Sequence, residues 1–159
     1  GSIDPTIIPY LIEHEGMTGQ QVEDMLNRQS GLLGVSGLSS DSRDVCEAAA
    51  QGNARAQLAL RIQVHGIKKY IGAYTAEMNG LDALVFTAGI GENDTDLRRM
   101  VCGQMDYLGI AVDEARNAAA PRGQITDISV PDARVRTWVI PTDEEYMIAM
   151  DTAKLAQTL

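Results

Sequence analysis

Asp82-Ala-Leu-Val-Phe-Thr-Ala-Gly-Ile-Gly-Glu-Asn93 carries more structural information than any other part of this chain of 159 residues. Within it, Leu84 to Phe86 form a short apolar run, which is typical of a buried parallel strand. The small residues of Thr87-Ala-Gly-Ile-Gly91 follow as a turn that lets the backbone approach a ligand closely. Asn93 or Asp94 then caps a helix. This order of strand, glycine turn and helix N-terminus predicts a phosphate or nucleotide site.

An ordinary strand-to-helix turn remains an alternative, because a short glycine motif is weak evidence by itself. A dinucleotide fingerprint fits less well, since Gly89-Ile-Gly-Glu-Asn-Asp94 ends in a carboxylate that would repel a pyrophosphate. Asp113 lies where a ribose-binding acid belongs, but it also simply ends the apolar run 109–112. The Walker-type P-loop is excluded, because its pattern of a second glycine, lysine and serine or threonine does not occur.

The composition is that of an ordinary globular domain with a sizeable core, and 45% of the residues are apolar. The sequence contains neither a long apolar run for a membrane span nor a signal-peptide pattern. The net charge of −9 argues against nucleic acid as a partner, while Arg43, helix termini or Mg²⁺ could still attract a small anion. Cys46 and Cys102 lack metal or disulfide spacing, which favours buried thiols in a reducing compartment and hence a cytoplasmic protein.

The first half of the sequence predicts helices. A capping box of Thr18 and Gln21 opens one of them, and Asp41 begins a short helix that ends near Ala50. Residues 31–40 are rich in glycine and serine and are predicted to form a connector. A long helix from about Ala54 to Met78 ends at Asn79-Gly80, which are typical residues after a helix C-terminus.

The second half predicts alternating strands and helices. Strands are expected at 83–87, 109–112, 125–129 and 135–140, with helices at 95–106 and from Glu144 to about Gln157. This alternation predicts an α/β layer beside a helical first half, in one domain. Two lone histidines, His14 and His65, fit packing or surface roles better than catalytic ones.

Six segments taken together resemble the acetate and propionate kinase family. They are 1–5 (GSIDP), 30–37 (SGLLGVSG), 39–44 (SSDSRD), 69–74 (KYIGAY), 85–93 (VFTAGIGEN) and 139–145 (VIPTDEE). The ordered set is specific, and Phe86-Thr-Ala-Gly-Ile-Gly-Glu-Asn93 is close to diagnostic. The resemblance covers the whole chain but only the C-terminal half of the family's proteins. It also favours a native origin for Gly1-Ser2, which otherwise looks like a cloning scar.

The resemblance implies an α/β domain of the actin, Hsp70 and sugar-kinase superfamily, a ribonuclease H-like ATPase domain with a mixed sheet flanked by helices. It implies that residues 1–159 form the nucleotide-binding C-terminal half of a two-domain kinase whose N-terminal domain is absent. The intact protein would transfer phosphate reversibly from ATP to acetate with Mg²⁺, and it would form a homodimer through this half. The N-terminal half carries the family's catalytic residues, so the chain alone, an isolated domain or a proteolytic remnant, is expected to be inactive.

The resemblance also implies which residues bind the nucleotide and the metal. The nucleotide-binding residues are Asp41, Ser42, Arg43, Gly89, Ile90, Gly91 and Asn93, and the residue associated with Mg²⁺ is Glu144. Ser42 replaces a bulkier residue that is frequent in the family, and Ala88 stands where the superfamily often has glycine. The residues themselves leave plainer roles open: Asp41 as a helix cap, Arg43 as a surface ion pair and Glu144 as a carboxylate in a first helical turn.

Two further functions remain as alternatives. A propionate or butyrate kinase has the same chemistry, and one methylene in an apolar pocket is worth only about 1–3 kcal/mol of discrimination. A non-catalytic module for nucleotide binding and dimerisation is the alternative for this chain alone. In each case the expected partners are a nucleotide, a small carboxylate and a second copy of the chain, without nucleic acid or membrane.

Overall fold

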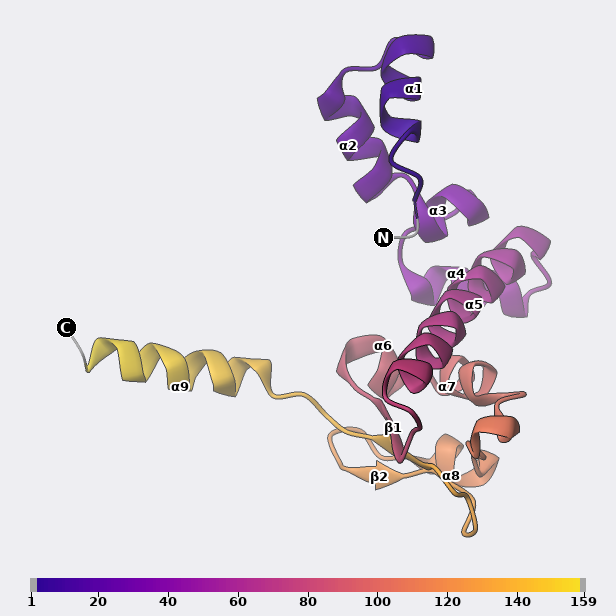
Figure 1. The fold of residues 1–159 in the computed structure, drawn as a ribbon, viewed down its shortest axis with the longest axis vertical. Helices are drawn as coiled ribbons and strands as arrows, with labels where there is room; N and C mark the ends of the chain where they lie inside the picture. Colours follow the sequence, from indigo (N-terminus) through magenta and orange to yellow (C-terminus); the bar gives the residue numbers. More distant parts are fainter. Residues whose placement is uncertain (1–2, 158–159) are drawn as a thin grey trace. The chain divides into compact units, whose positions relative to one another are not determined.

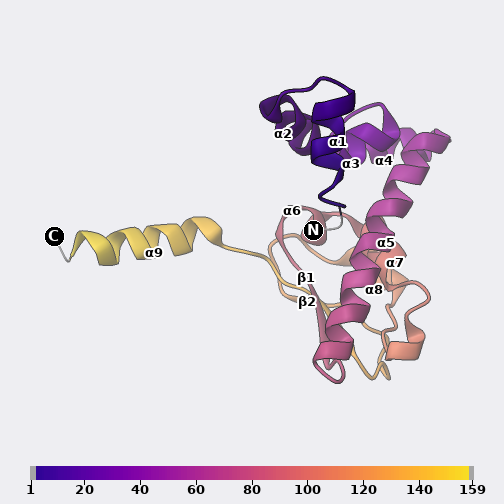
Figure 2. The same cartoon turned by 45° about the horizontal axis from the view of Figure 1, so that its top comes forward.

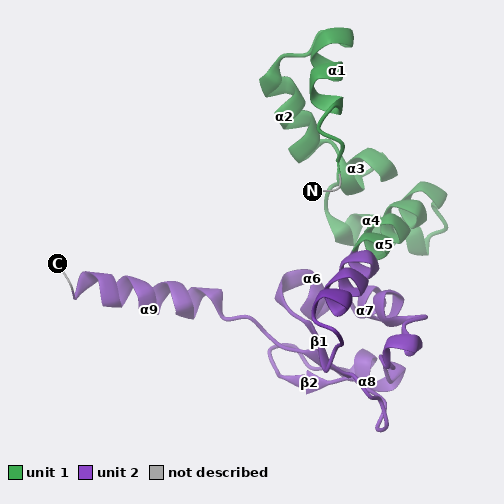
Figure 3. Ribbon diagram, viewed as in Figure 1, with its two compact units in different colours: residues 1–66 green, residues 67–159 purple. Residues whose placement is uncertain are grey.

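The structure, a computed structural model, describes residues 3–157, so Gly1-Ser2 and the question of their origin lie outside the described residues. The chain divides into two compact units, Gly1–Gly66 and Ile67–Leu159 (Figure 3). The boundary falls inside one long helix. That all 159 residues form one domain stays a prediction.

The first unit is helical, as the sequence predicts. Its helices are α1 (Ile7–His14), α2 (Gly19–Arg28), α3 (Gly31–Ser36), α4 (Ser42–Ala50) and the first part of α5 (Ala54–Glu77). The predicted capping box opens α2: the Gln21 N–H donates to Thr18 Oγ1 at 3.2 Å, and the Thr18 N–H donates to Gln21 Oε1 at 2.8 Å. Asp41 caps α4, which was also predicted.

The core of the first unit explains one wrong prediction. Val45, Ala56, Ala59 and Leu60 are buried together, and Leu32 and Val35 are among the residues that pack against them. Because these two apolar side chains belong to residues 31–36, tertiary packing stabilises a helix where the glycine content suggested a connector. Gly37, in the left-handed region at φ 69°, then ends α3.

Helix α5 runs without a break for 24 residues (Figures 1 and 2). It ends where predicted, because Asn79 (φ 56°) and Gly80 (φ 142°) both leave the right-handed helical region. Neither α5 nor any other helix of the described part of the chain has the length and apolar character needed to cross a membrane.

The second unit is an α/β layer with a small mixed sheet. Its elements after α5 are β1 (Ala83–Phe86), α6 (Ala88–Asn93), α7 (Thr95–Cys102), the 3₁₀ helix η1 (Asp106–Leu108), α8 (Glu114–Ala119), β2 (Thr126–Asp127), β3 (Arg136–Val139) and α9 (Glu144–Ala156). The strand order is β1-β3-β2. Strand β1 pairs with β3 in parallel, with Phe86 opposite Val139, and β2 pairs with β3 in the antiparallel sense. This confirms the predicted mixed sheet flanked by helices.

The strands are shorter than the sequence suggests. The run 109–112 forms two isolated bridges, Ile110 to Val135 in parallel and Val112 to Ser129 antiparallel, because it turns from one neighbour to another. The run still contributes to the core, since Ile110 is only 1% exposed. Ile128 and Val135, from the two neighbouring predicted strands, are fully buried. The apolar runs therefore predict which residues of this unit are buried better than they predict the lengths of its strands.

Candidate functional site

The glycine-rich stretch after β1 is a short helix instead of the open turn predicted. Helix α6 begins at Ala88, directly after Thr87, and it contains Gly89, Ile90, Gly91 and Asn93. Ala88 has a φ of 58°, in the left-handed region that costs a residue with a β-carbon about 1–2 kcal/mol. The chain thus turns sharply at Ala88, from the sheet into α6.

The candidate nucleotide residues divide between the two sides of α6. Gly89, Ile90 and Asn93 are exposed, and a β-carbon placed on Gly89 would meet nothing within 4 Å. Gly91 is partly buried, and a β-carbon there would lie 3.3 Å from the carbonyl carbon of Phe86. Gly91 is therefore needed to pack α6 against the end of β1. No contact within the chain requires a glycine at position 89, so the backbone of Gly89 is open to a ligand.

Two side chains of α6 hold this stretch in place. Asn93 Nδ2 donates to the Gly89 carbonyl oxygen at 2.8 Å. Glu92 Oε1 accepts hydrogen bonds from the Thr142 N–H at 2.9 Å and from Thr142 Oγ1 at 3.2 Å. Since Thr142 lies two residues before Glu144, the structure links the glycine-rich helix to the segment that carries the predicted metal residue.

Arg98 of α7 supports α6 from the inner side, a role that the sequence reasoning missed. Its side chain is 1% exposed. Nη1 donates to the carbonyl oxygens of Gly91 at 2.9 Å and Glu92 at 2.8 Å, and Nε donates to Asn117 Oδ1 at 2.7 Å. Nη2 donates to Thr95 Oγ1 and to the Asn117 carbonyl oxygen, both at 3.2 Å. All five donors of the guanidinium are used, and burial lowers the pKa of Arg98.

The sequence did contain a signal for this arginine. Leu97 and Val101 are buried four residues apart on α7, and Arg98 and Cys102 are buried four residues apart beside them. An arginine in such an i, i+1, i+4, i+5 pattern lies on the apolar side of its helix. Its neighbour Arg99 lies outside the pattern, half exposed and paired with Asp96 at 3.0 Å.

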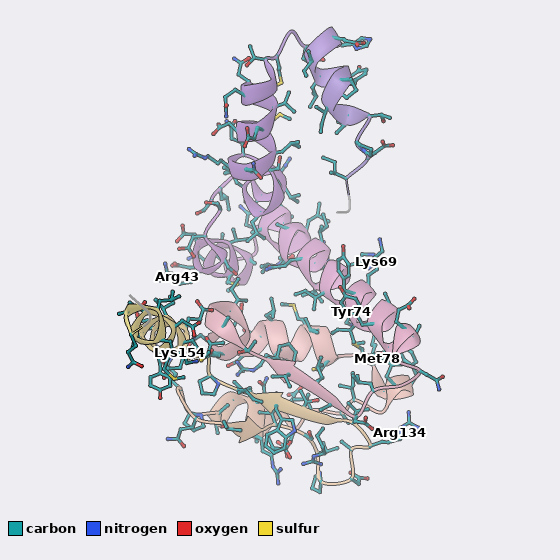
Figure 4. All side chains as sticks on the ribbon, turned by 60° about the vertical axis from the view of Figure 1, so that its left-hand side comes forward. Arg43, Lys69, Tyr74, Met78, Arg134 and Lys154 are labelled. Atoms are coloured by element: carbon teal, nitrogen blue, oxygen red, sulfur yellow. The ribbon has the colours of Figure 1, made fainter. Side chains whose placement is uncertain are left out.

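The first predicted nucleotide segment lies in the first unit, at the start of α4. Asp41 Oδ1 accepts from the Arg43 N–H at 2.8 Å, and Asp41 Oδ2 accepts from Arg43 Nη2 at 2.6 Å. The Arg43 side chain is nevertheless 89% exposed, and Figure 4 labels it on the surface of the helix. These hydrogen bonds from Arg43 lower the pKa of Asp41 to about 2. The segment therefore offers a preformed, accessible guanidinium, and Ser42 beside it is half-buried.

Glu144 lies in the first turn of α9 with its side chain exposed. Asp143 caps that helix by accepting from the Tyr146 N–H at 3.1 Å. Among the described residues, no group of three or more histidine, cysteine, aspartate or glutamate side chains is arranged to hold a metal ion. A single exposed carboxylate suits Mg²⁺, which keeps several of its waters and binds few protein ligands.

Two other residues that the sequence raised have structural roles. Asp113 caps α8 by accepting from the Arg116 N–H at 3.0 Å, which accounts for an acid at the end of the apolar run. Cys102 is buried, and this burial raises the pKa of its thiol to about 12. A thiol with such a pKa is unreactive at neutral pH.

Comparisons with known proteins agree on one family. A family model described as the acetokinase family matches residues 1–150. An acetate kinase of Moorella thermoacetica is 57% identical over 157 residues, covering 99% of this chain and 39% of that protein. One of Methanosarcina acetivorans is 53% identical over 158 residues, covering 99% and 38%. The chain thus spans about two fifths of the length of the curated relatives it matches.

Solved structures give the same picture. The crystal structure of Porphyromonas gingivalis acetate kinase is 46% identical with a TM-score of 0.87, covering 98% of this chain and 39% of that one. A propionate kinase from Francisella tularensis is 39% identical with a TM-score of 0.84, covering 94% and 37%. These neighbours confirm the actin- and sugar-kinase-like fold class.

The two glycines of α6 should respond differently to a methyl group. Gly91→Ala should lower the free energy of unfolding by about 1–3 kcal/mol, because the added β-carbon crowds the Phe86 backbone. Gly89→Ala should be neutral or stabilising by up to about 1 kcal/mol, since its β-carbon has free space and alanine favours the helix. Urea unfolding followed by the fluorescence of the single tryptophan, Trp138 in β3, measures both. Equal effects would contradict the division of α6 into two sides.

Removing the Arg43 side chain should raise the pKa of Asp41. In Arg43→Met the carboxyl should titrate closer to its ordinary value of 3.8, while the retained backbone N–H keeps it slightly below. Because the folded-state pKa is depressed, the pair stabilises the fold above pH 3.8, and this contribution is lost as the pH falls towards 2. Carbon-detected NMR titration measures the shift, and Arg28→Met, on α2, is the control that should leave Asp41 unchanged.

Proposed function

Because this chain belongs to the acetokinase family, we propose that it supplies the nucleotide-binding half of an enzyme that transfers the γ-phosphoryl group of ATP reversibly to acetate. The observation that carries the proposal is the exposed side of α6. Gly89, Ile90 and Asn93 lie open there, while Gly91 and Arg98 fix the helix from within. A backbone held in this way can bind a nucleotide without reorganising.

The proposed division of work follows from the chemistry of phosphoryl transfer. The reaction needs mainly positioning and charge neutralisation, because the negative charge is spread over the oxygens of the transferred group. Residues 41–43 would contribute adenosine contacts and residues 89–93 contacts to the adenosine and nearby phosphates. The arginines that stabilise the transition state would come from outside this chain. The chain alone is therefore expected to be inactive, as a nucleotide-binding module.

Glu144 is the proposed Mg²⁺ residue. Bound to the nucleotide, Mg²⁺ supplies neutralisation of phosphate charge, and the exposed carboxylate of Glu144 would hold the ion through water. Its support is the hydrogen-bonded link from Glu92 to Thr142, which fixes the start of α9 relative to the exposed side of α6. Metal and nucleotide would then be bound by connected parts of the second unit.

Propionate is the second candidate substrate, favoured by the likeness to the propionate kinase of Francisella tularensis. The acyl pocket would lie outside this chain, so the residues described here serve either carboxylate equally. A cytoplasmic location, where thiols stay reduced, is proposed from the buried thiol of Cys102.

Substitutions on the exposed side of α6 should affect the nucleotide far more than the carboxylate. In the intact enzyme, Gly89→Val or Asn93→Ala should raise the KM for ATP by on the order of tenfold to a hundredfold through misplacement of the nucleotide. The KM for acetate should change little. Gly19→Val, a helical glycine of α2 with equally free space around its β-carbon, is the matched control. Steady-state kinetics with each substrate varied in turn measures the split, and equal changes in both KM values would contradict the assignment.

Glu144→Ala in the intact enzyme should lower kcat and raise the Mg²⁺ concentration needed for half-maximal rate. The physical reason is the loss of a negative charge that orders the waters of the ion. Glu145→Ala, in the same helical turn, is the control and should titrate like the unmodified enzyme. A normal magnesium titration for Glu144→Ala would leave this residue as a helix-start carboxylate only.

The proposed dimer would use α5. Apolar side chains that lie four or eight residues apart along this helix remain exposed: Leu58 43%, Ile62 51%, Tyr70 48% and Tyr74 61%. Figure 4 labels Lys69 and Tyr74 on α5, and Met78 directly after its end. A row with this spacing winds around the helix and forms a ridge of the kind that packs into a groove of a second helix. A two-fold dimer would supply that partner.

Light scattering should give the intact protein a mass of two chains that does not change with concentration. Tyr74→Glu should shift this mass towards a monomer, because a charge would be buried in the interface. Tyr107→Glu, on η1 and 70% exposed, is the control that should remain dimeric. A monomeric mass for the intact protein at tens of micromolar would remove the dimer proposal.

A further inference from the structure

Helix α6 cannot be stable by itself. It has six residues and none of them is buried, whereas isolated helices shorter than about 12 residues are marginal in water. Four of its carbonyl groups nevertheless find partners at its end. The Gly89 and Ile90 oxygens accept from Asn93 Nδ2 and the Asp94 N–H, and the Gly91 and Glu92 oxygens accept from Arg98. The last two of these bonds come from another helix, α7, and both come from one guanidinium.

That guanidinium is itself held by a third helix. Asn117 of α8 is 1% exposed, and it accepts from Arg98 Nε through its side chain and from Nη2 through its carbonyl. Asn117 Nδ2 also donates to the Thr95 carbonyl oxygen at 3.0 Å, which ties α8 to the first residue of α7. The direction in which Arg98 points is therefore fixed by two elements, and Arg98 in turn fixes the end of α6.

We infer that Arg98, oriented by Asn117, is a positioning residue that sets the placement of the exposed backbone of α6 and thereby the affinity of the enzyme for its nucleotide. The inference rests on the proposed nucleotide function of residues 89–93. Arg98 lies on the inner side of α6, so it acts through Gly91 and Glu92 and does not touch the ligand. Because Glu92 Oε1 accepts from the Thr142 N–H, the position of α6 also affects the position of Thr142.

A lysine cannot reproduce this arrangement, because it has three donors at one point in place of five in a planar fork. Lysine keeps the positive charge, so any effect of the substitution comes from the lost hydrogen-bond geometry of the guanidinium. In the intact enzyme, Arg98→Lys should raise the KM for ATP and the dissociation constant for ADP by on the order of tenfold, with the KM for acetate within about twofold, as expected for a shift of a positioning element. Arg99→Met, the adjacent exposed arginine of α7, is the matched control and should leave all three constants unchanged.

ADP titration calorimetry and steady-state kinetics on folded protein, checked by thermal melting, give the result. If Arg98→Lys does not fold, Asn117→Ser takes its place, since it removes the acceptor of Nε and leaves Arg98 intact. Unchanged nucleotide constants in a folded variant, or equal changes for ATP and acetate, would overturn the inference. Gly89→Val in the same assays separates the two levels: if it raises the ATP constants and the Arg98 and Asn117 variants do not, the positioning role alone fails, whereas an unchanged Gly89→Val would overturn the nucleotide function.

Discussion

The buried guanidinium of Arg98 is the interaction on which the rest of the second unit depends. Removing a charge from water is costly, and it is tolerated here because five oxygen atoms receive the five N–H groups. Those oxygens come from α6, α7 and α8, three short helices with six to eight residues each. This polar centre joins the three helices in addition to the apolar packing of Leu97 and Val101, and it defines their directions more strictly, because hydrogen bonds require particular angles.

The helix starts show how much local sequence can reveal. Thr18 and Asp41 each accept a backbone hydrogen bond at the position the sequence predicts, because a cap depends on residues only two or three apart. The long α5 and the order of strands and helices follow from periodicity in the same way. Helix α3 could not be predicted, because it depends on contacts of Leu32 and Val35 with the core around Val45.

The candidate site was partly predictable for the same reason. The glycine-rich stretch and its neighbours form a recognisable sequence motif, so Gly89, Ile90 and Asn93 could be named as candidate nucleotide-binding residues from the sequence. The different duties of Gly89 and Gly91 depend on the Phe86 backbone, whose position is set by pairing with β3. At Asp41 and Arg43 the cap and the ion pair are both present, so the plain structural role and the proposed binding role occupy the same atoms. Local hydrogen bonds there preorganise an exposed cation without revealing its ligand.

The parallel pairing of β1 with β3 has a consequence for how the molecule forms. Residues 88–119 contain α6, α7, α8 and the Arg98–Asn117 contact, and these partners lie close together in sequence. The strand that precedes them pairs instead with residues roughly 50 positions further along, and such distant contacts are slow to form because the intervening loop must first be closed. The helical cluster can therefore assemble early during synthesis. The sheet that anchors its first residue is complete only after Val139 has left the ribosome.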